Sequence, residues 1–265
     1  MIRFTLAGYH ESLLSVAYPG DQHGYTYVQP AMQVLLQHWP WSRSQRQQII
    51  IRSDAEQGTD ANIRYLRAEQ FQVLLKGHSG SRTAAWVRSV AGHLWERDPD
   101  NPQRWAAACP VRHPSGADVQ AWLLRWPGAQ GSWQHSTLVS SVPGTVFDLW
   151  ALYDGRGATE VEIRADKSGL GLPQRRKHSL SAQEGWLVLT DMAHNLLAWV
   201  CGWMLVGSAF EHFGPQRLVQ DVFPIPGRLC FAGNRLEHVA LLASHPYARE
   251  LRQCLHTLLL TFDLD

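Results

Sequence analysis

Four polar residues in the middle of the chain have the types and the spacing of an active-site wall. They are Tyr153, Arg156, Glu160 and Lys167. In an α-helix, which turns by about 100° per residue, they would fall within an arc of about 60°. That face would offer two cations, a phenol and a carboxylate, which suits a polyanion beside a metal ion. The alternative is a solvated face on which Arg156 and Glu160 form an ion pair four residues apart.

A second carboxylate is needed if Glu160 is to hold a metal, because Mg²⁺ is usually bound by one or two carboxylates plus substrate phosphate. Asp54 is the natural partner, since it directly follows the β-branched run Ile49–Ile51. A helix over residues 60–70, capped by Thr59 or Asp60, and a buried strand over residues 71–75 should follow. Such a strand, helix, strand unit implies parallel strands, and ligands bind outside the carboxyl ends of such strands. The alternative for Asp54 is a turn or capping aspartate.

The remaining pattern predicts further elements on both sides of this unit. A strand is expected at the start of the chain and a helix within residues 28–39. A helix is then expected over residues 148–167, where two glycines weaken the first turns by up to about 1 kcal/mol each. Further predictions are a helix over residues 181–213, a hairpin turn at Gly233 and Asn234, and a final helix over residues 248–260.

Residues 78–144 differ from the rest of the chain, because tryptophans occur there among Pro, Gly, Ser and Arg with short alternating stretches. We predict a mainly β insertion subdomain over residues 78–144, between core halves at residues 1–77 and 145–265. The fold class predicted from this order of elements is α/β.

The charge balance directs the chain toward no particular partner. The net charge is +1, from 24 basic and 23 acidic residues, so any polyanion site must be local. The compact basic run Arg175, Arg176 and Lys177 is one candidate, and a solvated loop is the alternative. The four cysteines are far apart and form no zinc pattern, which favours a reduced, cytoplasmic protein.

Residues 192–210 carry no formal charge and approach the length of a membrane span. His194 and Asn195 near their start, and the absence of flanking Lys or Arg, count against a span. We therefore predict a buried core helix and no membrane partner, with His194 a hydrogen-bonded core residue. A membrane-associated protein is the alternative, which complete recovery in the soluble fraction would exclude.

The pattern Tyr-x2-Arg-x3-Glu-x6-Lys, filled by Tyr153, Arg156, Glu160 and Lys167, resembles the signature of the DDE transposases of bacterial insertion sequences. Three other stretches resemble the same family in the right order. They are IIIRSDAEQGTDANIRYL around Asp54, MAHNLLAW after the signature, and RLVQDVFPIPGRLCFAGNRLEHVAL near the end. The resemblance extends from about Tyr9 to Leu260 and is weakest in the tryptophan-rich region.

This resemblance implies a ribonuclease-H-like core, a mixed sheet flanked by helices, with the β insertion between the second and third acidic residues. It makes Asp54 and Glu160 the catalytic ligands of two Mg²⁺ ions, for which Mn²⁺ could substitute. It gives Tyr153, Arg156 and Lys167 contacts to the DNA backbone, which Arg175, Arg176 and Lys177 could extend. The implied partners are double-stranded DNA of the element ends and target, and a second copy in a synaptic complex. The implied reaction is hydrolysis followed by strand transfer.

The first acidic residue of that family has no match here. Asp21 is the only aspartate before Asp54, and it lies in the turn-like stretch PGDQHG. We therefore expect a chain that lacks the amino-terminal part of the family. A non-catalytic DNA-binding remnant is the alternative function, and salt-sensitive binding without cleavage would favour it.

Overall fold

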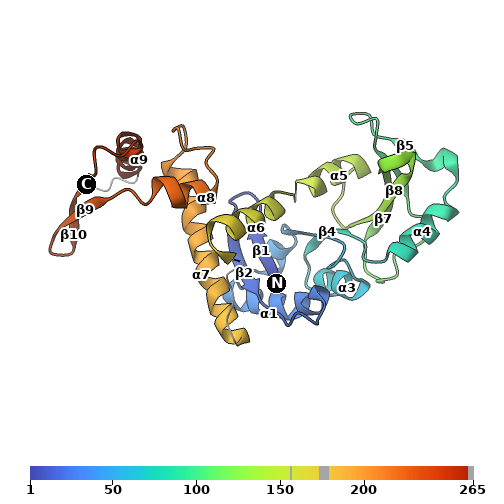
Figure 1. Ribbon diagram of the computed structural model, residues 1–265. Helices are drawn as coiled ribbons and strands as arrows, with labels where there is room; N and C mark the ends of the chain where they lie inside the picture. The colour runs from blue at the N-terminus through green and yellow to red at the C-terminus, as the bar shows by residue number, and fades with distance from the viewer. Residues whose placement is uncertain (156, 173–178, 262–265) are drawn as a thin grey trace. The chain divides into compact units, whose positions relative to one another are not determined.

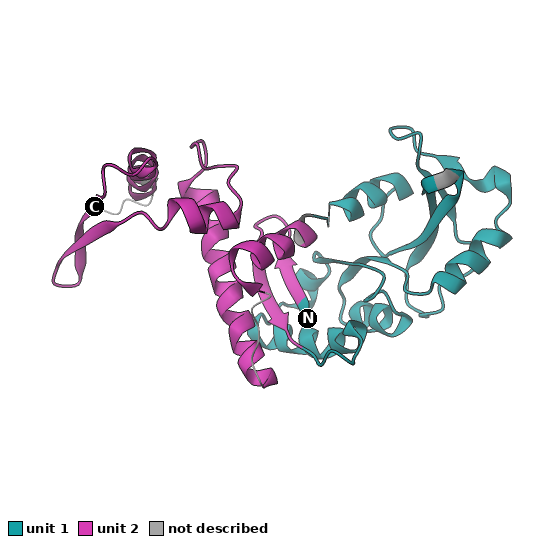
Figure 2. Ribbon diagram, in the orientation of Figure 1, with its two compact units in different colours: residues 1–2, 18–157 teal, residues 3–17, 158–265 magenta. Residues whose placement is uncertain are grey.

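The computed structural model describes residues 1–155, 157–172 and 179–261. Figure 2 shows the two compact units into which the chain divides. Unit 1 comprises residues 1–2 and 18–157, and unit 2 comprises residues 3–17 and 158–265. Each unit has its own secondary structure and its own buried clusters, so each is described by itself.

A mixed sheet of six strands forms the centre of unit 1 (Figure 1). In spatial order the strands are β3 (Ile50–Ser53), β4 (Gln72–Lys76), β8 (Trp133–Ser140), β7 (Gln120–Pro127), β6 (Trp105–Ala108) and β5 (Glu96–Arg97). β3 and β4 are parallel, whereas the other neighbouring pairs are antiparallel. This mixed sheet with flanking helices agrees with the expected ribonuclease-H-like α/β fold.

The predicted strand, helix, strand unit is confirmed. α3 (Asp60–Ala68) connects β3 to β4, and the Thr59 hydroxyl caps it by accepting a hydrogen bond from the Asn62 amide at 3.3 Å. Its side chains Ile63 and Leu66 are buried. This short crossover makes the carboxyl ends of β3 and β4 neighbours, with Ser53 paired to Leu75.

Helices cover both faces of the sheet in unit 1. They are α1 (Val28–His38), α2 (Arg43–Arg46), α4 (Gly80–Ser89) and α5 (Val146–Asp154), with short 3-10 turns at Gly24–Tyr27, Gly92–Leu94 and Ala129–Gly131. Leu149 and Trp150 of α5 pack with Leu124 of β7. On the other face, Leu123 of β7 packs with Trp86 of α4. Successive side chains of β7 point to opposite faces of the sheet, so this strand contributes to a hydrophobic cluster on each face.

The tryptophan-rich residues 78–144 contain α4 and the four strands β5 to β8, in agreement with a mainly β region. These strands continue the sheet of β3 and β4, because β8 pairs with β4 at Leu75 and Val139. The boundaries of an insertion subdomain stay a prediction.

Unit 2 begins with a two-stranded sheet of β1 (Ile2–Leu6) and β2 (Glu11–Val16), of which the sequence predicted only the first strand. The helices that follow are α6 (Gly157–Gly169), α7 (Leu180–Trp199), α8 (Pro215–Arg217) and α9 (Ala248–Thr261), with π-helical turns at Val200–Met204 and Leu218–Val222. The predicted hairpin is confirmed as β9 (Gly227–Ala232) and β10 (Arg235–Leu241), with Gly233 at a positive φ of 61°. α7 packs on β2.

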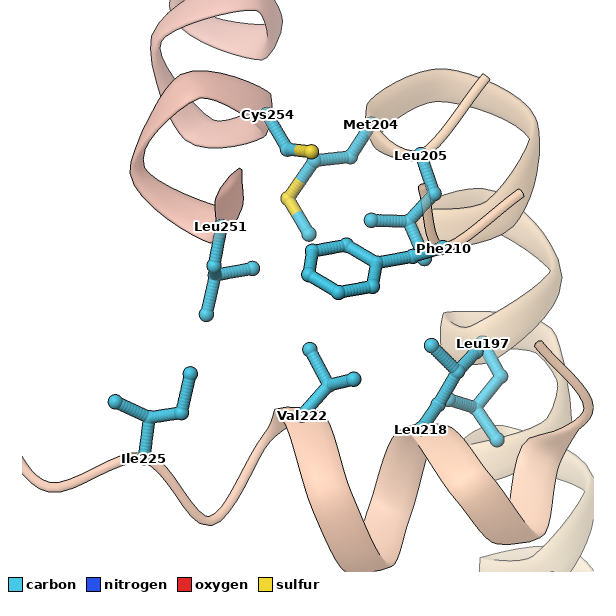
Figure 3. Close-up of a cluster of buried hydrophobic side chains, with 9 residues drawn as sticks. All are labelled: Leu197, Met204, Leu205, Phe210, Leu218, Val222, Ile225, Leu251 and Cys254. Atoms are coloured by element: carbon cyan, nitrogen blue, oxygen red, sulfur yellow. The ribbon is translucent and has the colours of Figure 1, made fainter. Parts of the chain in front are cut away.

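Figure 3 shows the hydrophobic cluster of the C-terminal half of unit 2. Phe210 is fully buried there, between Met204 after α7, Val222 after α8 and Leu251 of α9. Residues from four successive segments thus share one core, which fixes α9 on the end of α7.

Two sequence predictions about helices are wrong. The helix expected over residues 148–167 is two helices, because α5 ends at Asp154 and α6 begins at Gly157. The two glycines at this point weaken a continuous helix, and the boundary between the compact units also falls here. The single arc calculated for the four signature residues therefore does not apply.

The apolar helix expected over residues 181–213 ends at Trp199 and continues only as the short π-helical turn. It is not buried all round: Leu187 and Leu197 are buried, whereas Leu189 and Met192 are 59% and 57% exposed. In the part of the chain that the structure describes, no helix is long and apolar enough to cross a membrane.

Candidate active site

Asp54 lies at the carboxyl end of β3, where the sequence placed it. It is half-buried, and its Oδ1 accepts a hydrogen bond from the Glu56 amide at 3.1 Å. This is the local turn that aspartates favour after a strand. The turn uses a single carboxylate oxygen. The roles of Asp54 as a turn residue and as a metal ligand are therefore compatible.

The loop after Asp54 is fixed against the end of β4. A Cβ atom on Gly58 would lie 1.8 Å from the carbonyl oxygen of Lys76, so no other residue fits there without a shift of the backbone. The His78 amide donates to the Gly58 carbonyl at 3.1 Å. The His78 Nδ1 lies 3.0 Å from the Ala55 carbonyl and donates to it. These contacts hold the loop and Asp54 in one arrangement.

A second acidic residue, Glu56, lies in the same loop. Its Oε1 accepts a hydrogen bond from the Gly24 amide at 2.9 Å. Burial raises the pKa of the nearby Tyr18 phenol, and the charges of Glu56 and Asp54 raise it further. Tyr18 is therefore a neutral hydroxyl at neutral pH, able to donate a hydrogen bond at this end of the sheet.

Lys76 is the functional candidate that the sequence analysis missed. The parallel register pairs Ser53 with Leu75, so the next residues along the two strands are Asp54 and Lys76. The Lys76 ammonium lies 5.1 Å from the centre of the Tyr153 ring and 5.8 Å from that of Trp126. The rule that selected Asp54, its place at the carboxyl end of a parallel strand, also selects Lys76.

Tyr153 is held by the packing of α5 in unit 1. Its side chain is buried against Leu74 and Leu138 of the sheet. The guanidinium of Arg52, from β3, donates to the Leu152 carbonyl at 2.6 Å. The last turn of α5 is therefore fixed directly on β3, the strand that Asp54 follows, and this brings Tyr153, Lys76 and Asp54 into one region of unit 1.

Glu160 and Lys167 lie in unit 2, on α6. They are seven residues apart, about two helical turns, so they share one helix face, and both are exposed. Glu160 is in the first turn of the helix and Lys167 in the last. A carboxylate at the N-terminal end and a cation at the C-terminal end both complement the helix dipole.

The structure describes only some of the remaining residues that the sequence analysis singled out. Arg156, Arg175, Arg176 and Lys177 lie outside the described residues. His194 is buried and hydrogen-bonded, as predicted. Asp21 is exposed in a turn.

Among the residues that the structure describes, no three or more His, Cys, Asp or Glu side chains are grouped to hold a metal ion. Asp54 belongs to unit 1 and Glu160 to unit 2. Carboxylate oxygens are nevertheless the donors that Mg²⁺ prefers. Both residues fit the ion by the chemistry of their ligand atoms.

Comparison with known families gives one match. Residues 7–261 match the family model described as Transposase DDE domain group 1. The match covers nearly the whole chain and both units. No curated protein matches the chain.

Proposed function

Because the chain belongs to the DDE transposase family, and so is a transposase catalytic domain, we propose that Asp54 and Glu160 are two of its metal ligands. The family is one of enzymes that cut and join DNA, typically with divalent metal ions. The ions proposed here are two Mg²⁺, or Mn²⁺ in their place. When bound, they would stabilise the attacking and leaving oxygens of an in-line displacement at a DNA phosphodiester.

The observation that carries this proposal is the set of polar groups at the carboxyl end of the parallel pair β3 and β4. Asp54 supplies a carboxylate fixed by its own turn, and Lys76 supplies a cation at the end of the neighbouring strand. Tyr153, from the sequence pattern that resembles the family's signature, contacts that cation. A carboxylate that could bind a metal ion and a cation that could bind a phosphate thus follow neighbouring positions of the two parallel strands.

The chain's own residues have separate tasks in this proposal. Asp54 and Glu160 provide the oxygen ligands. Lys76 and Lys167 bind phosphate oxygens of the DNA backbone, which positions the duplex without reading its sequence. Tyr153 orients Lys76 through its ring face.

Arg156, together with Arg175, Arg176 and Lys177, would extend the contact along the backbone. The substrates are double-stranded DNA of element ends and target. A homodimer in a synaptic complex would bring two such ends together.

Metal-dependent nicking and strand transfer on element-end DNA test the proposal. Asp54→Asn and Glu160→Gln should each abolish product formation at any Mg²⁺ or Mn²⁺ concentration. Asp118→Asn in unit 1 and Glu184→Gln in unit 2 are matched controls, because both side chains are exposed and lie outside the proposed site. Equal activity of Glu160→Gln and Glu184→Gln would contradict the proposal. Salt-sensitive DNA binding by a chain that never cleaves would instead support the DNA-binding remnant.

A further inference from the structure

Four charged side chains are buried together in unit 2, close to the helix that carries Glu160. Arg3 comes from β1, Asp166 from α6, and Asp191 and His194 from α7. The side chains of Arg3 and Asp166 are fully buried, and those of His194 and Asp191 are 8% and 14% exposed. Two positive and two negative groups balance, as buried charges require.

Arg3 connects the two carboxylates. Its Nη1 donates to Asp166 Oδ2, and its Nη2 lies 2.8 Å from Asp191 Oδ1. Its Nε donates to the Ser15 hydroxyl at 3.0 Å, and that hydroxyl donates to Asp191 at 2.9 Å. The guanidinium therefore joins α6, α7 and β2.

The geometry around His194 sets its protonation state. Nδ1 lies 2.9 Å from Asp166 Oδ1, and Nε2 lies 2.8 Å from the carbonyl oxygen of His10. Both partners accept hydrogen bonds, so both ring nitrogens must donate, and a histidine with two N–H groups is an imidazolium. Burial alone would lower the pKa of His194, but the hydrogen bond and charge of Asp166 and the His10 carbonyl outweigh burial and the nearby Arg3, and the pKa is raised.

Helix α6 has two faces with different tasks. Asp166 and Glu162, four residues apart, face β1, β2 and the turn between them, where Glu162 Oε1 lies 2.5 Å from His10 Nδ1. Glu160 and Lys167 lie about 130° further round the helix and are exposed. The buried network thus holds α6 by one face, and Glu160 and Lys167 lie on its exposed face.

We propose that Asp166, Arg3 and His194 are positioning residues for the active site, which fix the orientation of α6 and so of Glu160, and that they do so only with His194 as an imidazolium. The proposal deepens the function proposed above and rests on it where Glu160 is concerned. Neutralising one member leaves a buried charge without its partner, which is strongly destabilising at such sites.

The sign of the pH dependence follows. A histidine whose pKa is higher in the folded state stabilises fully below its ordinary pKa of about 6.5, and this contribution is lost as pH rises through the folded-state value. The charged groups that face His194 are Asp166 from α6 and Arg3 from β1, and the loss as pH rises is assigned to the imidazole itself.

Nitrogen NMR of the full chain with labelled histidine tests the protonation state directly. Two protonated ring nitrogens on His194 at pH 7 are expected, and a neutral ring would overturn the proposal. Hydrogen exchange of α6 amides is followed on the same sample. Their protection should fall as His194 titrates at alkaline pH, and constant protection through that titration would also overturn the proposal.

Variants then connect the network to Glu160. His194→Gln should lower the protection of α6 by about tenfold or more, remove its alkaline dependence and reduce nicking. His212→Gln, at an exposed position of unit 2, is the matched control and should change neither.

If His194→Gln does not fold, the titration of the unmodified chain still tests the proposal. Glu160→Gln could leave nicking intact while the hydrogen-exchange protection of α6 still changes with the protonation of His194. In that case Glu160 is not a metal ligand, and the buried network is confirmed to hold α6 in place. Unchanged protection in a folded His194→Gln overturns the network itself.

Discussion

The ammonium group of Lys76 lies over the ring of Tyr153, 5.1 Å from its centre. Lys76 ends β4 and Tyr153 lies on α5, so this contact connects a strand end with a helix inside unit 1. A cation that rests on an aromatic face keeps its full charge and its three N–H donors. The contact therefore fixes the direction of Lys76 without using up its capacity to bind phosphate.

Replacing Lys76 by glutamine should reduce DNA nicking by about tenfold to a hundredfold, because a preorganised donor to phosphate is removed. The slope of log affinity against log salt should become shallower by about one, the value for one lost phosphate contact. Stability should fall by only about 0.5–2 kcal/mol. Nicking rates and binding isotherms at several salt concentrations measure both effects.

Two controls accompany this prediction. Arg88→Gln removes an equal charge from an exposed position on α4 and should leave nicking unchanged. Lys76→Arg keeps the charge and should retain most of the binding but less of the rate, since its donors are differently placed. Indistinguishable salt slopes for Lys76→Gln and Arg88→Gln would rule out a phosphate contact at Lys76.

Gly58→Ala should disrupt the loop that carries Asp54. The added methyl group would lie 1.8 Å from the Lys76 carbonyl oxygen, a backbone atom that cannot rotate away. We expect a loss of about 1–3 kcal/mol in the free energy of unfolding, the range for overpacking, and a fall in nicking. Gly80→Ala is the control, because open space surrounds that position in the same unit. Equal melting temperatures for the two variants would show that the loop adjusts freely.

Local signals in the sequence predicted the strand, helix, strand unit and the place of Asp54. Runs of β-branched residues, a Thr59 cap and the rule for strand ends all act over a few residues, and all three agree with the structure. The same rule would have found Lys76, had it been applied to the second strand as well as the first.

The buried network could not be predicted in this way. Arg3 and Asp166 are 163 residues apart, and charges on an otherwise polar helix indicate a solvated face. The break between α5 and α6 also depends on tertiary structure. Two glycines weaken a helix by only about 1 kcal/mol each, and the division of the chain into units at Gly157 is a tertiary feature that local propensity does not contain.

His113 should make unit 1 less stable in mild acid. It is buried in unit 1, and burial lowers its pKa, with the neighbouring Arg82 also lowering it and Asp60 only partly compensating. A histidine that is harder to protonate when folded binds more protons when unfolded. Stability should therefore fall as pH drops below the ordinary value of about 6.5.

Melting temperatures at pH 7.5 and pH 5.5 measure this effect. The difference should be smaller in His113→Gln than in the unmodified chain. His93→Gln, at an exposed position of the same unit, should keep the full difference. A His113→Gln chain that loses as much stability in acid as the unmodified one would assign the acid sensitivity to other groups.

Arg125 should be a stabilising residue of the tryptophan-rich sheet. Its guanidinium carbon lies 4.2 Å from the centre of the Trp95 ring, 4.7 Å from that of Trp133 and 5.0 Å from that of Trp105. Burial lowers its pKa, so the charge costs free energy to hold there, and the three ring faces offset that cost. Arg125→Leu removes all three contacts.

We expect Arg125→Leu to lower the free energy of unfolding by about 1–2 kcal/mol, because cation–π contacts are worth most where the cation is partly desolvated. For a chain of this size that corresponds to a fall of about 2–8 °C in the melting temperature. Arg112→Leu, at an exposed position, is the control and should change it little. Arg125→Lys should lie between the two, since an ammonium keeps the charge but cannot stack as a planar group. If Arg125→Leu melts at the temperature of Arg112→Leu, the three tryptophans stabilise the sheet by their own packing and the cation adds nothing.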